Sequence, residues 1–278
     1  MKTNIIFTFI LTANLFYSSS FGQKKLDVTY IANSGFLVES DSKSIIIDAL
    51  FKQGWDNYLI PTDTIVSDII KKQDPFEKAK LMLVTHNHGD HFDPGMVADY
   101  LLNNEENILI GSPNVSNAVL QHPEYKKIGR QVVQLDKLNR EKNDTTIHGI
   151  RVRSFFLQHD ARPQIENVGY LIEMDNLKVF HSGDYNGSEL VDFEKLQLQN
   201  ENIDLAFLNF YGFWTTKEEQ EFTNKYIKPK QIVLMHIPPV EVKTVRDTVN
   251  LIDDFIDITV FESSMERKSF DFNAPKIN

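Results

Sequence analysis

Short apolar runs separated by polar or glycine-containing breaks recur along the whole chain, a pattern typical of β-strands joined by turns. One run, Ile45 to Ile47, is entirely β-branched and predicts a strand that is buried on both faces. The runs together predict strands at residues 26–30, 36–39, 44–48, 81–85, 108–110, 131–135, 145–157, 168–174, 177–180, 205–208, 232–235, 259–261 and 268–272.

Helices are predicted between many of these runs. Asp63 is the expected cap of a helix over 64–72, and Asp93 followed by Pro94 predicts the start of a helix that continues to residue 103. Because strands cluster in both halves of the chain, with helices between and after them, we expect one α/β (α+β) domain of two packed sheets covered by helices. The other predicted helices are 113–121, 186–198, 215–226 and 242–255.

The first 22 residues differ from the rest of the chain. Lys2 gives a charged start, the run from Ile5 to Phe16 is mostly apolar, and small residues precede Gln23. This is the pattern of a signal peptide, and the apolar run is shorter than the ~20 residues that a membrane span needs. We therefore expect residues 1–22 to be cleaved and residues 23–278 to form an exported protein, periplasmic or secreted, without stable membrane insertion.

Composition limits the partners and the metal ligands. The chain carries 29 basic and 39 acidic residues, a formal net charge of -10, which disfavours nucleic acid as a partner. It contains no cysteine, so disulfides and thiolate ligands are excluded. Any metal must be bound by nitrogen and oxygen atoms.

The most informative stretch is His86-Asn87-His88-Gly89-Asp90-His91, which holds three of the eight histidines. It follows the predicted strand 81–85 and precedes the predicted helix that begins at Pro94. An extended backbone places His86 and His88 on one side, whereas the adjacent Asp90 and His91 diverge toward another. Imidazoles and a carboxylate at a strand end predict a metal site.

Three further polar residues, His159, Asp184 and His236, also follow apolar strands closely. Strand ends on one sheet edge can converge, and seven ligands suit two metal ions better than one. We assign His86, His88 and His159 to a first ion, and Asp90, His91 and His236 to a second. Asp184 bridges the two ions, because a carboxylate has two oxygens.

With these residues and their order, the chain resembles the metallo-β-lactamase superfamily from about Leu26 to Phe261. The resemblance implies a four-layer αββα sandwich with two metal ions at one edge of the sheets. The early strands, Asn167 to Tyr170 and Ser182 to Asp184 look most like the branch that contains ascorbate-6-phosphate lactonase and N-acylphosphatidylethanolamine phospholipase D. The presence of Asp184 and the lack of cysteine argue against antibiotic hydrolysis.

The resemblance implies a hydrolase with two divalent ions, zinc first, with manganese or iron as alternatives. Hydroxide bridging the ions would attack a phosphodiester or a lactone, and Asp90 would orient it or carry its proton. The site would suit a small anionic substrate. Two alternatives remain: an iron-dependent oxidoreductase, such as a persulfide dioxygenase, on the same fold, and a non-catalytic metal-binding protein.

Residues near the predicted site are candidates for substrate contacts. Trp55, Tyr58 and Trp214 lie in connections that could form pocket walls, with core packing as the alternative for each. Arg162 is close to His159 in sequence and could hold a substrate anion.

The remaining three histidines are not assigned to the metal ions. His181 lies just before Ser182-Gly183 and is expected to support the site or pack in the sheet. His122 and His148 lie in polar stretches and are expected at the surface.

Overall fold

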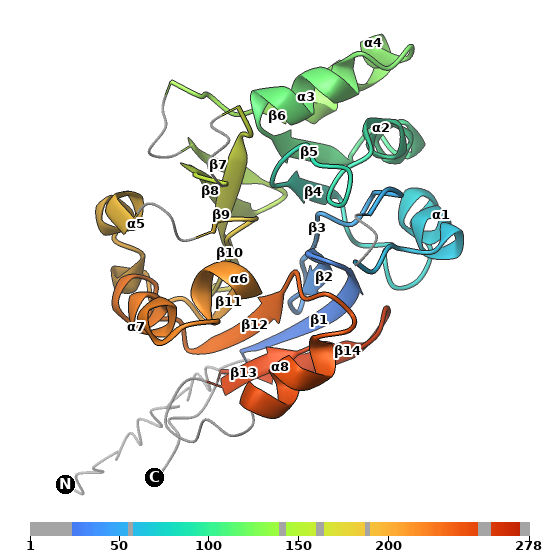
Figure 1. The fold of residues 1–278 in the computed structure, drawn as a ribbon. Helices are drawn as coiled ribbons and strands as arrows, with labels where there is room; N and C mark the ends of the chain where they lie inside the picture. Colours follow the sequence, from blue (N-terminus) through green and yellow to red (C-terminus); the bar gives the residue numbers. More distant parts are fainter. Residues whose placement is uncertain are drawn as a thin grey trace, which may run out of the picture.

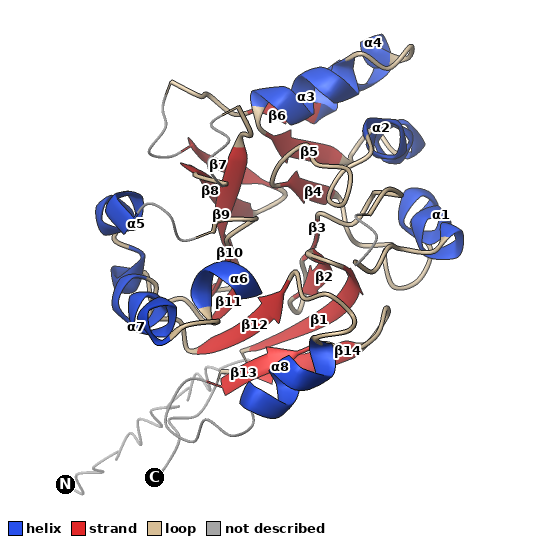
Figure 2. Ribbon diagram, viewed as in Figure 1, coloured by secondary structure: helices blue, strands red, loops and turns tan. Residues whose placement is uncertain are grey.

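The computed structural model describes residues 24–54, 58–138, 143–159, 164–186, 190–249 and 257–272. In these ranges the chain forms two seven-stranded sheets packed face to face, with helices on both outer faces (Figure 1 and Figure 2). The predicted four-layer αββα sandwich is therefore confirmed. The first half of the chain builds one sheet and the second half builds the other, except that the last strand returns to the edge of the first sheet.

The first sheet begins with antiparallel strands and continues with parallel ones. Its strand order is β14 (Arg267–Asp271), β1 (Lys25–Ala32), β2 (Gly35–Glu39), β3 (Ser44–Ile47), β4 (Leu81–Val84), β5 (Ile108–Gly111) and β6 (Val132–Gln134). Strand β3 is buried along its whole length, as its β-branched run predicted.

The second sheet has the same plan, antiparallel at one side and parallel at the other. Its order is β13 (Asp257–Val260), β12 (Gln231–Met235), β11 (Leu205–Asn209), β10 (Leu177–His181), β9 (Asn167–Met174), β8 (Ile150–Leu157) and β7 (Asn143–Ile147). Because parallel strands end at the same edge, β10, β11 and β12 deliver their following residues to one side of the molecule.

Apolar side chains fill three layers: between the sheets, and between each sheet and its helices. Phe36 of β2 and Phe207 of β11 meet across the sheets with ring centroids 4.6 Å apart. The Tyr170 hydroxyl of β9 donates a hydrogen bond across the sandwich to the Val84 carbonyl at 2.7 Å. These contacts fix the position of the β4 end, where the histidine-rich stretch begins.

Helices cover both outer faces (Figure 2). On the first sheet they are α1 (Asp63–Lys71), α2 (Pro94–Asn103), α3 (Pro113–Leu120), α4 (Tyr125–Ile128) and the 3-10 helix η1 (Gly129–Gln131). On the second they are α5 (Leu190–Leu196), the 3-10 helix η2 (Leu198–Asn200), α6 (Phe210–Phe213), α7 (Lys217–Tyr226) and α8 (Val242–Val249). Within the described ranges, no helix combines the length and apolar character that crossing a bilayer requires.

Some local predictions need correction. The single strand predicted over 145–157 is the hairpin β7–β8, whose turn at His148 and Gly149 has φ of 51° and 74°. Thr62 rather than Asp63 caps α1, because its side chain accepts the Ile65 amide hydrogen. Helices α4 and α6 were not predicted, and the predicted segments 187–189 and 250–255 lie outside the described residues.

Candidate metal centre

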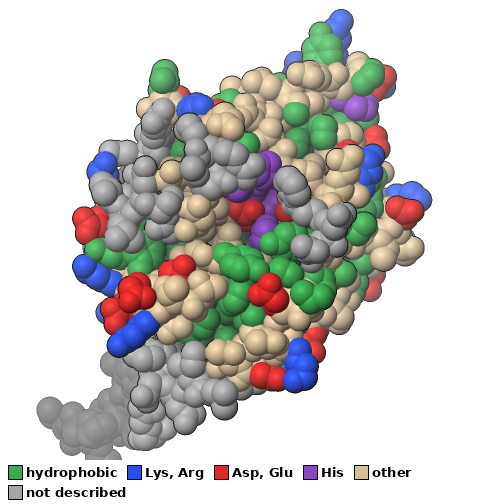
Figure 3. Space-filling model, viewed as in Figure 1, with side chains coloured by type: hydrophobic (Ala, Val, Ile, Leu, Met, Phe, Trp, Pro, Cys, Tyr) green, Lys and Arg blue, Asp and Glu red, His purple; other side chains and the backbone are tan. Residues whose placement is uncertain are grey.

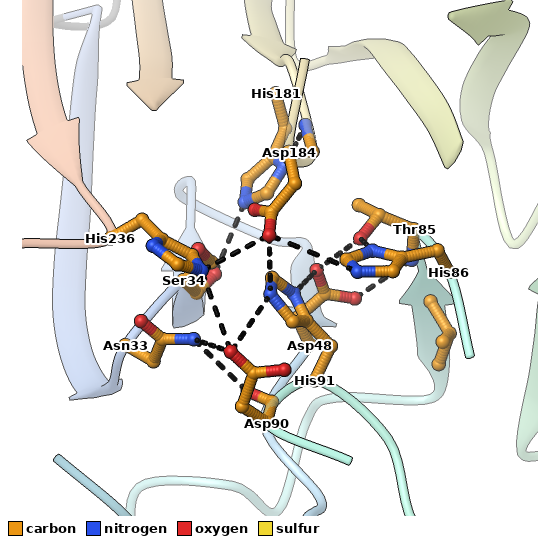
Figure 4. Close-up of polar contacts among 12 residues, drawn as sticks. Asn33, Ser34, Asp48, Thr85, His86, Asp90, His91, His181, Asp184 and His236 are labelled. Atoms are coloured by element: carbon orange, nitrogen blue, oxygen red, sulfur yellow. Dashed lines mark hydrogen bonds and ion pairs between the residues drawn. The ribbon is translucent and has the colours of Figure 1, made fainter. Parts of the chain in front are cut away.

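Residues that follow β4, β8, β10 and β12 meet at one edge of the two sheets. Figure 4 shows those that follow β4, β10 and β12, namely His86, Asp90, His91, Asp184 and His236. The structure brings all seven side chains predicted as ligands into one cluster, of which six are buried and His88 is half-buried. Three groups of these residues have potential ligand atoms within 4.8 Å of one another. The groups are His86, His88 and His159; Asp90, His91 and His236; and His86, His91 and Asp184.

The first two groups are the sets that the sequence assigned to the two ions; we call them the imidazole trio (His86, His88, His159) and the carboxylate trio (Asp90, His91, His236). The loop after β4 contributes residues to both trios. The amides of His91 and Phe92 donate to the His88 carbonyl at 3.1 and 3.0 Å, a tight turn before α2. Asp93 then caps α2 by accepting from the Met96 amide at 3.0 Å, as predicted.

Asp184 lies between the trios. Its Oδ2 atom is close to four imidazole Nε2 atoms, at 3.0 Å from His236, 3.1 Å from His91, 3.7 Å from His159 and 3.8 Å from His86. Asp184 therefore contacts histidines of both trios.

Asn167 and Gly183 fix the orientation of Asp184. Asn167 Oδ1 accepts the Asp184 amide hydrogen at 3.0 Å, and its Nδ2 donates to the Ser182 carbonyl at 3.3 Å. Gly183 has a φ of 55°, and an added Cβ would lie 2.1 Å from Asn167 Oδ1. The turn therefore requires glycine, both for its conformation and for the close approach of Asn167.

Asp48 was not among the predicted site residues, yet it supports both trios. It is fully buried just after β3, with a φ of 44°. Its Oδ2 accepts from Thr85 Oγ1 at 2.5 Å and from His91 Nδ1 at 2.8 Å, and its Oδ1 accepts from the Thr85 amide. The signal that could have found it is the one used for the others, a polar residue directly after a buried strand.

These hydrogen bonds assign the ring nitrogens. Because the Thr85 hydroxyl donates to Asp48, it accepts the proton of His86 Nδ1, which lies 3.0 Å away. The Nε2 atom of His86 then carries a lone pair, and within the described residues it makes no hydrogen bond. A buried, unpaired imidazole nitrogen facing other ligand atoms fits a metal ion.

Asn33 was not among the predicted site residues, and within the described ranges its hydrogen bonds reach the carboxylate trio and no member of the imidazole trio. From the β1–β2 turn, with φ of 50°, its Nδ2 donates to the Asp90 carbonyl at 3.2 Å and to Asp90 Oδ2 at 3.1 Å. Both partners are acceptors, so the orientation of the amide is unambiguous. The Asn33 carbonyl also accepts from the His236 amide at 3.3 Å.

In the carboxylate trio and at Asp184, the two histidines are held protonated and the two carboxylates are held ionised. Burial acts to lower the pKa of His236, but the charge of Asp184 and the bonds to Asp184 and Asp90 raise that pKa to about 9. At His91, burial is likewise outweighed by Asp184 and Asp48, which raise the pKa well above its usual value. Burial acts to raise the pKa of Asp184, but His236 and His91 hold it well below the usual range. This part of the centre therefore favours bound cations.

The imidazole trio behaves differently. Burial, followed by the charge of His91, lowers the pKa of His86 well below its usual value. Burial, followed by the neighbouring His159, lowers the pKa of His88 to about 4. These two imidazoles are therefore neutral at neutral pH, the form that binds metal ions.

The predicted substrate contacts have different outcomes. Tyr58 is half-buried, and its ring packs edge-on against the His236 ring at 4.4 Å between centroids. Burial, together with the nearby Tyr211 and Asp184, raises the pKa of Tyr58, so its hydroxyl stays protonated. Trp214 is buried in the core beneath the second sheet's helices, which favours packing, the alternative left open by the sequence. Trp55 and Arg162 lie outside the described residues.

The three unassigned histidines lie outside the cluster. His181 is fully buried in the sheet: its Nδ1 accepts from the Gly183 amide and its Nε2 donates to the Ser34 carbonyl, both at 3.1 Å. With both nitrogens occupied, it supports the Asp184 turn, as expected. His148 is exposed and His122 is partly exposed, in agreement with the sequence.

Comparison with known proteins gives one family match that covers most of the chain. The sequence model of the β-lactamase superfamily domain matches residues 27–236, which include all seven clustered side chains. The UPF0173 metal-dependent hydrolase of Thermococcus kodakarensis is 23% identical over 250 residues, covering 86% of this chain and 97% of that protein.

Solved structures share the fold. Igni18, a metallo hydrolase from Ignicoccus hospitalis, aligns with a TM-score of 0.56 and 20% identity over 90% of this chain and 100% of that one. CmlA, a diiron β-hydroxylase from Streptomyces venezuelae, aligns with a TM-score of 0.52 and 12% identity over 90% of this chain and 54% of that one. At such identities the similarity concerns the fold alone, and the fold is common to hydrolases and oxygenases.

Proposed function

The chain belongs to the β-lactamase superfamily, and on that premise we propose that it is a metal-dependent hydrolase with two divalent ions, cleaving a phosphodiester or a lactone. The observation that carries the proposal is the position of Asp184 Oδ2, 3.0 to 3.8 Å from four imidazole nitrogens of the two trios. The likeness to the Thermococcus hydrolase along most of the chain supports metal dependence and hydrolysis.

The donor atoms suit such ions. The imidazole trio would hold one ion, the carboxylate trio would hold the other, and Asp184 would join them. Nitrogen and oxygen donors without thiolate fit zinc, and they also accept manganese or iron. We propose zinc as the resident metal.

Bound divalent ions would polarise the scissile bond and lower the pKa of bound water to about 7. The side chains of the site would orient the water and accept its proton. Asp90 is held through Oδ2 by Asn33, while its Oδ1 is buried and makes no hydrogen bond within the described ranges. Asp90 Oδ1 is therefore available to orient an attacking water and to accept its proton.

The net charge of the metal-loaded centre indicates the class of substrate. Two divalent ions, less the charges of Asp90, Asp184 and a hydroxide, leave about +1 in the centre. Such a site stabilises an anionic transition state and favours a small anionic substrate. Export is part of the same proposal, although the predicted signal peptide lies outside the described residues.

The test is metal analysis combined with a substrate screen. Purified protein should contain about two metal ions per chain and hydrolyse phosphodiesters or lactones. Chelation should abolish hydrolysis and zinc should restore it. His88→Ala should lose both metal and activity, whereas His122→Ala, the matched change of a histidine outside the cluster, should retain both. Two bound ions with hydrolysis unaffected by His88→Ala would refute the proposal.

The same preparation separates the alternatives. An iron oxidoreductase would be isolated with iron, absorb visible light and consume oxygen or a persulfide. A non-catalytic protein would bind metal and leave every ester, lactone and phosphodiester intact. A colourless zinc protein whose hydrolysis depends on the metal excludes both.

A further inference from the structure

Exposed apolar side chains gather beside the carboxylate trio. We name Tyr58, Ile60, Tyr211 and Val240 the apolar rim. Ile60 is 44% exposed, Tyr211 41% and Val240 86%. Exposed apolar side chains are common singly, whereas a group of them beside a concave centre marks a candidate binding surface. Figure 3 looks into the hollow of the centre: histidine and acidic atoms are visible within it, and hydrophobic side chains border them on the lower side of the view.

Contacts of Tyr58, of Tyr211 and of the turn that carries Val240 connect the rim to the centre, and Ile60 follows Tyr58 by two residues. The Tyr58 ring lies against His236, at 4.4 Å between centroids. The turn after β12 carries Val240 and closes where the Glu241 amide donates to the Pro238 carbonyl at 2.8 Å. Tyr211, at the start of α6, donates its hydroxyl to Glu241 Oε1 at 2.9 Å, which ties α6 to that turn.

We propose that the apolar rim binds an apolar acyl or alkyl group of the substrate, so that the enzyme acts on esters with an anionic reacting group and a hydrophobic chain. This inference rests on the proposed hydrolase function and narrows its substrate class. A group that packs on Tyr58 also touches His236, so the rim is continuous with the reacting centre. A stable protein interface takes about 20 to 30 residues a side, far more than these four.

The test is a chain-length series on the metal-loaded protein. For alkyl p-nitrophenyl phosphodiesters from methyl to octyl, which carry an anionic reacting group, kcat/KM should rise about two- to fourfold for each methylene that the rim covers. Binding of methyl- to octylphosphonate, measured by calorimetry and independent of turnover, should tighten with the same trend. Val240→Ser and Tyr211→Ser should flatten both trends.

The chain offers matched controls. Leu138, in a turn, is 94% exposed and Tyr125, on the short helix α4, is 46% exposed, so Leu138→Ser and Tyr125→Ser replace an exposed aliphatic and an exposed tyrosine side chain by serine away from the rim. Both controls should keep the wild-type trends. Flat wild-type trends, or trends that the rim variants leave unchanged, would overturn the inference. So would self-association of the wild type that Val240→Ser abolishes, because the rim would then be an interface between copies.

Failure of the two proposals can be told apart. If no ester is cleaved but alkylphosphonate affinity rises with chain length and falls in the rim variants, the hydrolase proposal fails and the rim binds apolar chains. If esters are cleaved at rates independent of chain length, the hydrolase proposal holds and the rim inference fails. If neither cleavage nor a phosphonate trend is found, both fail.

Discussion

The two trios lie side by side, yet they are built differently. The imidazole trio contains no carboxylate, and its His88 is half-buried with a pKa lowered to about 4. The carboxylate trio is entirely buried, and its His236 has a pKa raised to about 9. The difference teaches that the carboxylate trio stabilises positive charge, whereas the imidazole trio offers neutral nitrogen ligands.

The supporting residues differ as well. Within the described ranges, Asn33 makes hydrogen bonds to Asp90 and His236 but to no member of the imidazole trio. Asp48 bonds directly to His91 and reaches His86 through the Thr85 hydroxyl. We therefore expect the carboxylate trio to bind its ion more tightly, with the ion of the imidazole trio exchanging more readily. Four predictions test this contrast, from the largest expected effect to the smallest.

Asp184→Asn should have the largest effect, because it removes charge from both halves at once. We expect metal content to fall from two ions to less than one, and kcat/KM to fall more than about 100-fold, beyond the loss typical of supporting residues. Elemental analysis and steady-state kinetics measure both. Asp99→Asn, an exposed change on α2, is the control and should match the wild type. Retention of two ions in Asp184→Asn would show that Asp184 does not bridge.

Asp48→Asn should weaken both halves, but less. An amide cannot accept all the hydrogen bonds that Thr85 and His91 donate to Asp48. His91 therefore loses its fixed orientation, and so does His86, which is held through Thr85. We expect metal affinity to fall about 10- to 100-fold for each ion, measured by competition with a chelator. A loss confined to one ion would contradict the shared role of Asp48.

Asn33→Gly should sharpen the contrast, because it removes the amide while keeping the left-handed turn. Affinity at the carboxylate trio should fall about tenfold, with the other ion unchanged. Asn33→Asp, which also tolerates this conformation, replaces the donor with a charge beside Asp90 and should weaken the same ion. Asn176→Gly, in the exposed β9–β10 turn with φ of 61°, is the control. Equal loss of both ions would remove the distinction between the halves.

The smallest effect concerns the stability of the metal-free protein. The pKa of His236 is raised from 6.5 to about 9, so its stabilisation is present below pH 6.5 and is lost as pH rises through about 9. The pKa of His88 is lowered from 6.5 to about 4, so stability falls as pH falls from 6.5 through about 4.

Thermal unfolding of the metal-free protein as a function of pH measures both the acid and the alkaline loss of stability. Each kcal/mol corresponds to a Tm shift of about 2–4 °C in a domain of 150–250 residues. His88→Gln should reduce only the acid loss, and His236→Gln only the alkaline loss. A variant that alters the opposite loss would contradict these assignments.

The sequence predicted much of this centre because strand ends mark it. The residues from His86 to His91 and Asp184 come after apolar runs, which the local sequence identifies as buried strands. Parallel strands end at the same edge of a sheet, so the residues that follow them lie close together. Asp48 obeys the same rule but was included in the strand 44–48. Its role depends on His91, 43 residues away, which no local pattern reports.

Other features were less visible in the sequence. Asn33 was not predicted as a site residue, because its contact with Asp90 spans 57 residues and no local pattern indicates it. The β7–β8 hairpin was missed because Ile147 and Ile150 flank His148 and Gly149 directly, although that glycine was a turn signal. The sequence could not decide whether Trp214 lines a pocket or packs in the core, because its neighbours in the core come from distant segments of the chain.

The most direct test of the two-half centre is a calorimetric titration of chelator-treated protein with zinc at pH 7. We predict two ions per chain in two resolved steps, the tighter one accompanied by proton release and weakened in Asn33→Gly. A single ion per chain, or two identical steps that Asn33→Gly shifts together, would contradict the account.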